Sequence, residues 1–386
     1  MRRFVTLGLL VLPASAWASP QALQGTVIDT RGHWTDDGLA IWTDAVVRTP
    51  DGDVVVSQLG GHADGYTMRL FGNGEEPLVV GMQVALAAHD DRDLAQRTYT
   101  VVDGVKVLAW PEGFVRTGPT QAGHYLFWES GCAFVTPDSQ GTKEIAGDGE
   151  FDAISACVDT WNTGTASCSY LTLKLEGRAP HEVGRDDINL IKFRDVSWCR
   201  PASGGAPAKC YAPSAAGITT AVFVDDPMSA RDGAIVDADV ELNGVDFAIA
   251  KDGTSLGVQS CQSELQNTLT HELGHLQGLE HPCLATGDPP RVDDKGRAVP
   301  SCSQTTDPVI TEATMYNFQE CGETKKETLS DDDINAICTI YPKAQDPGTC
   351  DKVGATPGCC GASPHPGAAL WLAGVVLALT LRRRKS

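Results

Sequence analysis

The stretch His271-Glu272-Leu273-Gly274-His275-Leu276-Gln277-Gly278-Leu279-Glu280-His281 holds three of the nine histidines in this 386-residue chain. Positions i and i+4 lie on one face of an α-helix, so His271 and His275 can present two imidazoles to one ion. A straight helix cannot bring His281 to the same ion. Gly278 permits the positive-φ turn that ends the helix and returns the chain. The spacing therefore predicts a helix over residues 263–279, followed by a sharp turn.

These residue types point to a catalytic metal centre. Three neutral imidazoles leave a fourth position open for water, as a catalytic zinc site requires. Zinc polarises that water, and Glu272 can accept its proton and later pass it to a leaving amine. We expect one catalytic Zn²⁺ held by His271, His275 and His281, with Glu272 as general base. An amphipathic helix with surface histidines would explain the pattern less completely.

The motif resembles the H-E-x-x-H-x-x-G-x-x-H signature of the metzincin peptidases. Downstream, Ala313-Thr314-Met315-Tyr316 resembles their Met-turn, and the Met-Tyr pair is similar to that of the matrixin-like group. The resemblance spans roughly residues 120–342. It implies an α+β catalytic domain with a twisted mixed sheet, a zinc helix and a C-terminal helix. It also implies Met315 beneath the zinc, Tyr316 in the neighbouring pocket wall, and zinc-dependent cleavage of peptide bonds in protein or peptide substrates.

The chain also departs from those groups. Pro282 follows the third histidine, as in serralysins, but the glycine-rich calcium-binding repeats of serralysins are absent from the sequence. No cysteine precedes residue 132, so there is no matrixin-type cysteine switch. Structural calcium or a second zinc stays open, without a located site. The conceivable ligands are His124, His181, Asp186 and Asp187. The alternative function is a catalytically silent zinc-bearing surface protein that serves in binding or adhesion.

Alternating and helical patterns predict the elements around the motif. Alternation predicts strands over residues 171–175 and 237–243, and apolar runs predict further strands over 189–193 and 219–224. Helical spacing predicts a helix over 151–161, and an N-cap at Ser330 with an acid three residues on predicts a last helix over 330–340. In metzincins the strand that corresponds to Asp237–Asn243 is an exposed edge that pairs with extended substrate. The same segment is also compatible with a buried strand, and the pattern does not choose between the two.

Residues 19–112 predict an all-β N-terminal module, either a small barrel or a sandwich, because short apolar runs alternate with turn signals. The histidines at 33, 62 and 89 are scattered and are expected at the surface. The sequence does not decide whether this module is a propeptide, an inhibitor or a binding module. The zinc peptidase domain is expected over residues 113–345.

Both ends of the chain carry export signals. Residues 1–18 read as a signal peptide with an Ala16-Trp17-Ala18 cleavage site. Residues 346–367 form a linker rich in Pro, Gly and Cys, and residues 368–386 form a short hydrophobic segment with a basic end. Together with Cys359-Cys360, this tail resembles the MYXO-CTERM sorting signals of myxobacterial exported proteins. The resemblance implies membrane contact before processing, and an extracellular or bacterial cell-surface or outer-membrane location. A simple membrane anchor is the alternative.

Cysteine and charge content narrow the class further. Thirteen cysteines in an exported chain predict disulfides, up to five among the ten cysteines between residues 132 and 338. Short loops favour the pairs Cys199–Cys210, Cys283–Cys302 and Cys321–Cys338. The formal net charge of −20 argues against nucleic acid as a partner, since phosphate would be repelled.

Overall fold

The computed structural model describes residues 23–50, 52–72, 77–86, 99–101, 113–257, 261–285 and 288–353. The expected signal peptide (1–18), the hydrophobic segment with its basic end (368–386) and most of the 346–367 linker lie outside these residues, as do His89, Cys359 and Cys360. Within the described part, no helix is long and apolar enough to span a lipid bilayer.

The fold is α+β, as predicted. Its main sheet has seven strands in the order β10-β9-β11-β15-β14-β5-β4. The bounds are Thr172–Leu175 (β10), Cys132–Pro137 (β9), Leu190–Arg194 (β11), Ile235–Asn243 (β15), Gly217–Val224 (β14), Tyr66–Phe71 (β5) and Gly61–Ala63 (β4). The first four strands run parallel, and β14, β5 and β4 each pair antiparallel with their neighbours.

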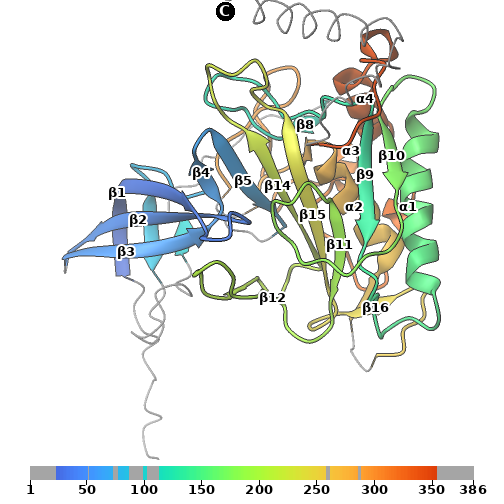
Figure 1. Cartoon of the computed structure of the whole chain (residues 1–386), viewed down its shortest axis with the longest axis horizontal. Helices are drawn as coiled ribbons and strands as arrows, with labels where there is room; N and C mark the ends of the chain where they lie inside the picture. Colours follow the sequence, from blue (N-terminus) through green and yellow to red (C-terminus); the bar gives the residue numbers. More distant parts are fainter. Residues whose placement is uncertain are drawn as a thin grey trace, which may run out of the picture.

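Two helices cover one face of this sheet (Figure 1). They are α1 (Gly149–Thr165) and α2 (Leu265–Leu276), and the Trp161 indole of α1 donates to Thr270 O of α2 at 2.9 Å. The largest hydrophobic cluster lies between these helices and the sheet. The short α3 (Pro308–Thr311) and the C-terminal α4 (Asp331–Ile340, N-capped at Ser330) follow α2. Helices α1, α2 and α4 match the predicted segments within a few residues.

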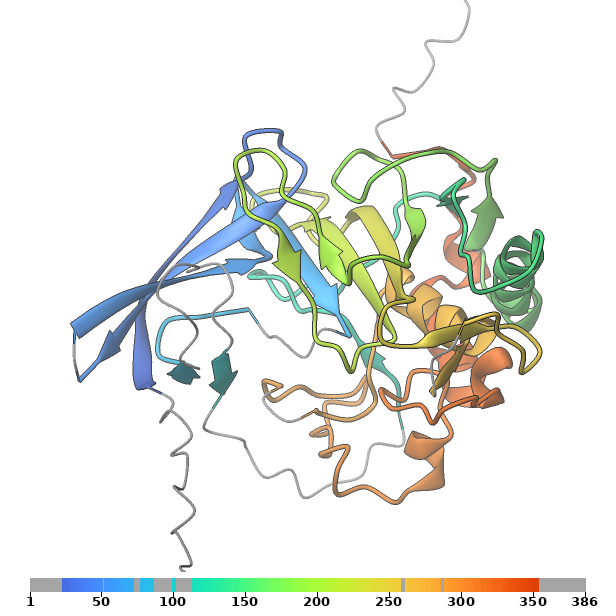
Figure 2. The same ribbon diagram turned by 90° about the horizontal axis from the view of Figure 1, so that it is seen from below.

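The N-terminal segment is all-β in its described residues, but it is not a self-contained barrel or sandwich. Five of its strands form one antiparallel sheet in the order β3-β2-β1-β6-β7, at the left of Figures 1 and 2. They are β1 (Leu23–Trp34), β2 (Ile41–Thr49), β3 (Gly52–Leu59), β6 (Gln83–Leu86) and β7 (Tyr99–Val101). The hairpin β4–β5 leaves this sheet and joins the other one. The apolar residues of both segments then form one common core, which explains the difference.

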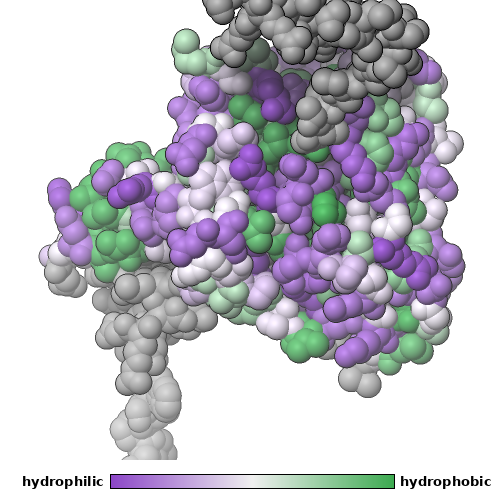
Figure 3. Space-filling model, in the orientation of Figure 1, coloured by the Kyte–Doolittle hydropathy of each residue, from purple (hydrophilic) through white to green (hydrophobic). Residues whose placement is uncertain are grey.

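The surface is mixed, as Figure 3 shows, with apolar side chains gathered over the five-stranded sheet and polar ones over much of the rest. Val55 on β3 is 47% exposed. The apolar side chains of the five-stranded sheet are therefore only partly covered.

Of the two alternatives for Asp237–Asn243, the buried strand is the one observed, because this segment is β15, which lies between β11 and β14. Polar and apolar residues alternate along β15 as the sequence indicates, but the polar face is buried like the apolar one. Asp239 accepts hydrogen bonds from the Gly184 and Leu190 amides, at 2.8 and 2.9 Å. Buried donors thus satisfy the carboxylates that would otherwise have to face water.

Five disulfides link the described cysteines: Cys132–Cys350, Cys168–Cys338, Cys199–Cys210, Cys261–Cys321 and Cys283–Cys302. Two of the three predicted pairs are confirmed. The pair Cys321–Cys338 is wrong, because α4 places Cys338 against Cys168 near the end of α1. Cys157 is free and buried within α1. Five bridges are typical of an exported protein that matures in an oxidising compartment.

Peptide mapping of the unreduced protein is expected to find these five pairs and to recover Cys157 unmodified. Burial raises the pKa of the Cys157 thiol to about 12, so alkylating reagents should reach it only after unfolding. A peptide linking Cys321 to Cys338, or rapid labelling of Cys157 in the folded chain, would contradict this arrangement.

Candidate metal centre

Helix α2 carries the first half of the motif and is buried over almost its full length. The Glu264 side chain caps its N-terminus by accepting from the Asn267 amide at 2.6 Å. The helix ends at Leu276, and Gly278 follows with φ 95°. A Cβ on Gly278 would lie 3.0 Å from Leu126 O, so glycine is also required there by close packing. The predicted turn is present.

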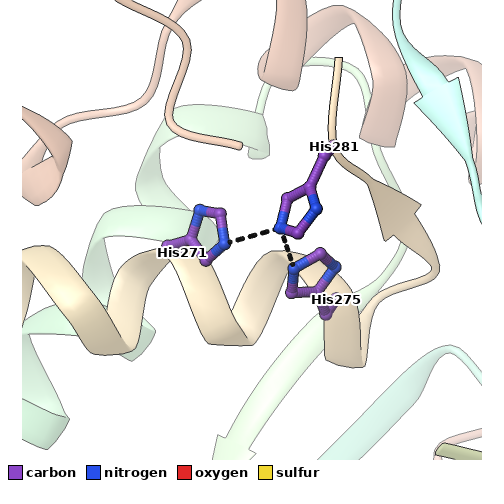
Figure 4. A group of neighbouring side chains, drawn as sticks. All are labelled: His271, His275 and His281. Atoms are coloured by element: carbon purple, nitrogen blue, oxygen red, sulfur yellow. Dashed lines mark hydrogen bonds between the residues drawn. The ribbon is translucent and has the colours of Figure 1, made fainter. Parts of the chain in front are cut away.

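The turn returns the chain as the short strand β18 (Leu279–Glu280), which pairs with β8 (Val115–Arg116). This pairing fixes the backbone that leads to His281. Figure 4 shows the result: the rings of His271, His275 and His281 converge from the helix and from the returning strand. His275 Nε2 lies 3.0 Å from His281 Nε2, which lies 3.3 Å from His271 Nε2.

Backbone carbonyls fix the tautomers of the two helical histidines. His271 Nδ1 lies 2.8 Å from Thr314 O, and His275 Nδ1 lies 2.9 Å from Leu279 O. A carbonyl can only accept, so each Nδ1 carries the proton and each Nε2 presents a lone pair. Burial lowers the pKa of His275 to about 4, and it also lowers the pKa of His271 and His281 well below the usual value. Burial thus favours the neutral form of all three rings, which is the form that could bind a metal ion.

This arrangement fits a tetrahedral cation. With His281 also protonated on Nδ1, three lone pairs would meet at about 3 Å, which is favourable only with a positive charge between them. Nitrogens bound at about 2.0–2.1 Å to a tetrahedral zinc ion are about 3.3 Å apart, which is close to the observed separations. Within the described residues, these three histidines form the one group of three or more candidate metal ligands. His124, His181, Asp186 and Asp187 are not brought together into a second such group.

Glu272 lies beside the triad and is held by a residue that the sequence did not single out. Thr219 on β14 donates to Glu272 Oε2 at 2.7 Å. Burial raises the pKa of Glu272 to about 8, and a dication held by the histidines would oppose this rise. Gly217, also on β14, leaves room for the other oxygen, since a Cβ there would lie 2.7 Å from Oε1. Both contacts join residues more than fifty positions apart, so no local pattern could reveal them.

Met315, which the resemblance assigns to a position beneath the zinc, packs against α2 at Gly274, between the two helical histidines. Met315 is 2% exposed, and a Cβ on Gly274 would lie 2.2 Å from its sulfur. The glycine between the two helical histidines is therefore what lets Met315 approach α2. Tyr316 packs edge-on against Phe318, with ring centroids 5.7 Å apart, and against the cluster around Cys283. The residues after Tyr316 line the cavity described below.

A buried ion-pair network adjoins the third histidine. Glu280 is 3% exposed, and its Oε2 lies 3.1 Å from Arg69 and 3.8 Å from Arg291. Burial alone would raise the pKa of Glu280, but Arg291 and Arg69 lower it to about 2. Arg291 also pairs with Asp288 at 2.7 Å. Arg69 comes from β5, so the N-terminal segment contributes directly to the surroundings of the triad.

A cavity of about 450 Å³ opens in front of these groups. Its lining includes Arg69, Phe71, Gly217, His271, Glu272 and His281. Asn317, Phe318 and Gln319 also line it, whereas Tyr316, which the resemblance places in the pocket wall, is not among its lining residues. A cavity of this size suits a small molecule or a short stretch of polypeptide.

If Glu272 serves as the general base expected from the sequence, Gly217→Ala should lower the rate of cleavage roughly ten- to hundredfold, because the added methyl group displaces the carboxylate. A ten- to hundredfold loss corresponds to about 1.4–2.8 kcal/mol of transition-state stabilisation, which is part of the roughly 10²–10⁴-fold that a positioned acid–base group contributes. Gly177→Ala is the matched control, since nothing lies within 4 Å of a Cβ there. Rates for both variants, with zinc content measured on the same samples, check the prediction. Equal rates would remove Gly217 from the site.

No protein-family model and no curated protein matches this chain.

Proposed function

We propose that this chain is a secreted or surface-attached zinc-dependent endopeptidase of the matrixin-like metzincin type. The observation that carries the proposal is the convergence of the three Nε2 atoms, with His281 Nε2 3.0 Å from His275 Nε2 and 3.3 Å from His271 Nε2, beside the buried carboxylate Glu272. His271, His275 and His281 would hold one Zn²⁺. Three protein ligands leave one position open, which is the pattern of catalytic rather than structural zinc.

When bound, zinc polarises a water molecule and lowers its pKa towards about 7. Glu272 moves the protons. Thr219 donates to Oε2 at 2.7 Å, which leaves Oε1 as the oxygen that would accept the proton of the attacking water. The same oxygen then delivers a proton to the leaving amine. Thr219 therefore orients the base without touching the substrate.

The supporting residues keep the three ligands in position. Thr314 O and Leu279 O fix the tautomers, and Met315 fills the space beneath α2. Such partners orient the ligands and tune the metal. A protein or peptide is the substrate class that we propose, and the acidic chain disfavours nucleic acid. The five disulfides support an extracellular location, and attachment to a bacterial surface through the C-terminal tail is part of the proposal.

The test uses the exported chain after purification. Zinc content is measured by elemental mass spectrometry, and cleavage of a denatured protein is followed before chelation, after chelation and after zinc is restored. We expect one zinc per chain at the triad, loss of cleavage with the metal and its return with added zinc. Cleavage that a chelator leaves unchanged would contradict the proposal. So would a fully zinc-loaded chain that cleaves no denatured protein, which would instead favour the silent binding protein.

A further inference from the structure

In the described part of the chain, strand β14 has a partner on both sides, because β15 and β5 flank it. Strand β14 carries Thr219 and Gly217, which contact Glu272, and it would be the outermost strand if the N-terminal segment were absent. A free edge strand is a template on which an extended polypeptide can add by main-chain hydrogen bonds. Here β5 occupies that edge through six residue pairs, from Thr219↔Phe71 to Val224↔Tyr66. In Figures 1 and 2, β5 lies directly alongside β14.

The end of β5 reaches the metal centre. Phe71 lies opposite Thr219 in the register, and its ring stacks on His275 with centroids 4.7 Å apart and planes 10° apart. Two residues earlier, Arg69 forms the ion pair with the buried Glu280 at 3.1 Å. Gly72, next after Phe71, also lines the cavity. The side chains of β5 that face the helices are thus part of the site.

The opposite face of β5 is buried in a core that both parts of the chain build. Met68, which faces away from the metal, is 1% exposed and packs in one cluster with Ile41 and Trp42 of β2. The same cluster contains these residues from the later part of the chain: Trp198, Tyr211, Ile218, Val222, Val224 and Val236. Departure of the hairpin would expose this apolar surface and remove a partner from Glu280, which monomeric proteins rarely tolerate.

The hairpin also leaves the cavity open. A strand acting as an inhibitory plug would fill the space before the histidines and Glu272. Instead, about 450 Å³ remains there, with Arg69 and Phe71 as one side of it. The position of β5 is therefore that of a wall.

We propose that β5 is a permanent wall of the reaction pocket, which takes the place of a substrate strand on β14. Substrate then binds against a wall that includes Arg69 and Phe71, and not by strand addition to β14. The alternative is a removable propeptide strand that must leave before substrate can bind. The role of β5 in substrate binding rests on the proposed peptidase function. Whether β5 stays paired with β14 can be tested without that function.

The test is a covalent lock. Met68 and Val222 face each other across the two strands, on the side away from the metal. Met68→Cys/Val222→Cys joins β5 to β14 by a disulfide, which peptide mapping verifies in the full-length chain. The two single variants control for the lost side-chain volume. Arg48→Cys/Asp53→Cys is the matched lock, since it joins β2 to β3 and leaves β5 untied.

We expect the locked chain to cleave a denatured protein within about twofold of the single variants and of the matched lock. A locked chain that is inactive while those controls cleave would overturn the inference, because the hairpin would then have to leave. Hydrogen exchange gives a readout that does not depend on catalysis. A permanent wall predicts that β14 amides exchange as slowly as those of β15, whereas faster exchange confined to β14 and β5 would contradict it. If no variant cleaves at all, the peptidase proposal fails, and the exchange result alone decides whether the wall is permanent.

Discussion

Glu272→Ala is expected to keep one zinc per chain and to lose activity by about a thousandfold or more. General acid–base catalysis contributes about 10²–10⁴ in rate, and here a single carboxylate would serve both proton transfers. Glu272 is not one of the three candidate metal ligands, which are all histidines, so its removal should leave zinc bound. The measurement is the initial rate of peptide hydrolysis together with zinc content, on protein purified in the same way as wild type.

Thr219→Val is the companion variant. It keeps the shape of the side chain but removes the hydrogen bond to Oε2, so the base should lose orientation rather than charge. A smaller loss, of about tenfold, is expected. Full activity in Glu272→Ala would show that Glu272 is not the general base. The hydrogen bond from Thr219 to Glu272 would then have no role in catalysis.

His281→Ala is expected to reduce bound zinc to well below one per chain and to bring cleavage to background. The two remaining imidazoles lie on one helix and cannot complete three-ligand coordination. The polypeptide should stay folded without metal, because five disulfides and the shared core hold it together. Chelation of the wild type should therefore be reversible. Bound zinc should still raise the unfolding temperature, since a ligand at 1,000 times its Kd stabilises by about 4 kcal/mol.

His33→Ala is the matched control for this variant, because His33 lies on the five-stranded sheet with its side chain 48% exposed. It should keep zinc, activity and the metal-dependent shift in unfolding temperature. Stoichiometric zinc and normal cleavage in His281→Ala would show that the ion lies elsewhere.

The sequence predicted the local part of the site well. Helical spacing places His271 and His275 together, and the turn at Gly278 follows from a glycine where only positive φ returns the chain. Both features arise within eleven consecutive residues, so pattern and geometry are directly linked. The Met-turn was placed by resemblance, and its contact with Gly274 gives that position a physical reason.

What the sequence missed depends on long-range packing. Thr219 and Gly217 contact Glu272 because β14 packs against α2. Arg69 contacts Glu280 because β5 joins the seven-stranded main sheet. The alternation of polar and apolar residues in β15 is the same as in a half-exposed strand, although all of its residues are buried. The pattern alone does not show that other parts of the chain cover the polar face. Loop length alone likewise misassigned Cys321, whose partner is Cys261.

The most direct test of the central claim is the zinc K-edge X-ray absorption spectrum of the zinc-loaded chain, compared with that of His281→Ala. The three-histidine site predicts three imidazole nitrogens and one oxygen at about 2.0–2.1 Å in the wild type, and loss of the bound ion in the variant. A first shell with sulfur at about 2.3 Å, or the same spectrum at full zinc occupancy in His281→Ala, would contradict it.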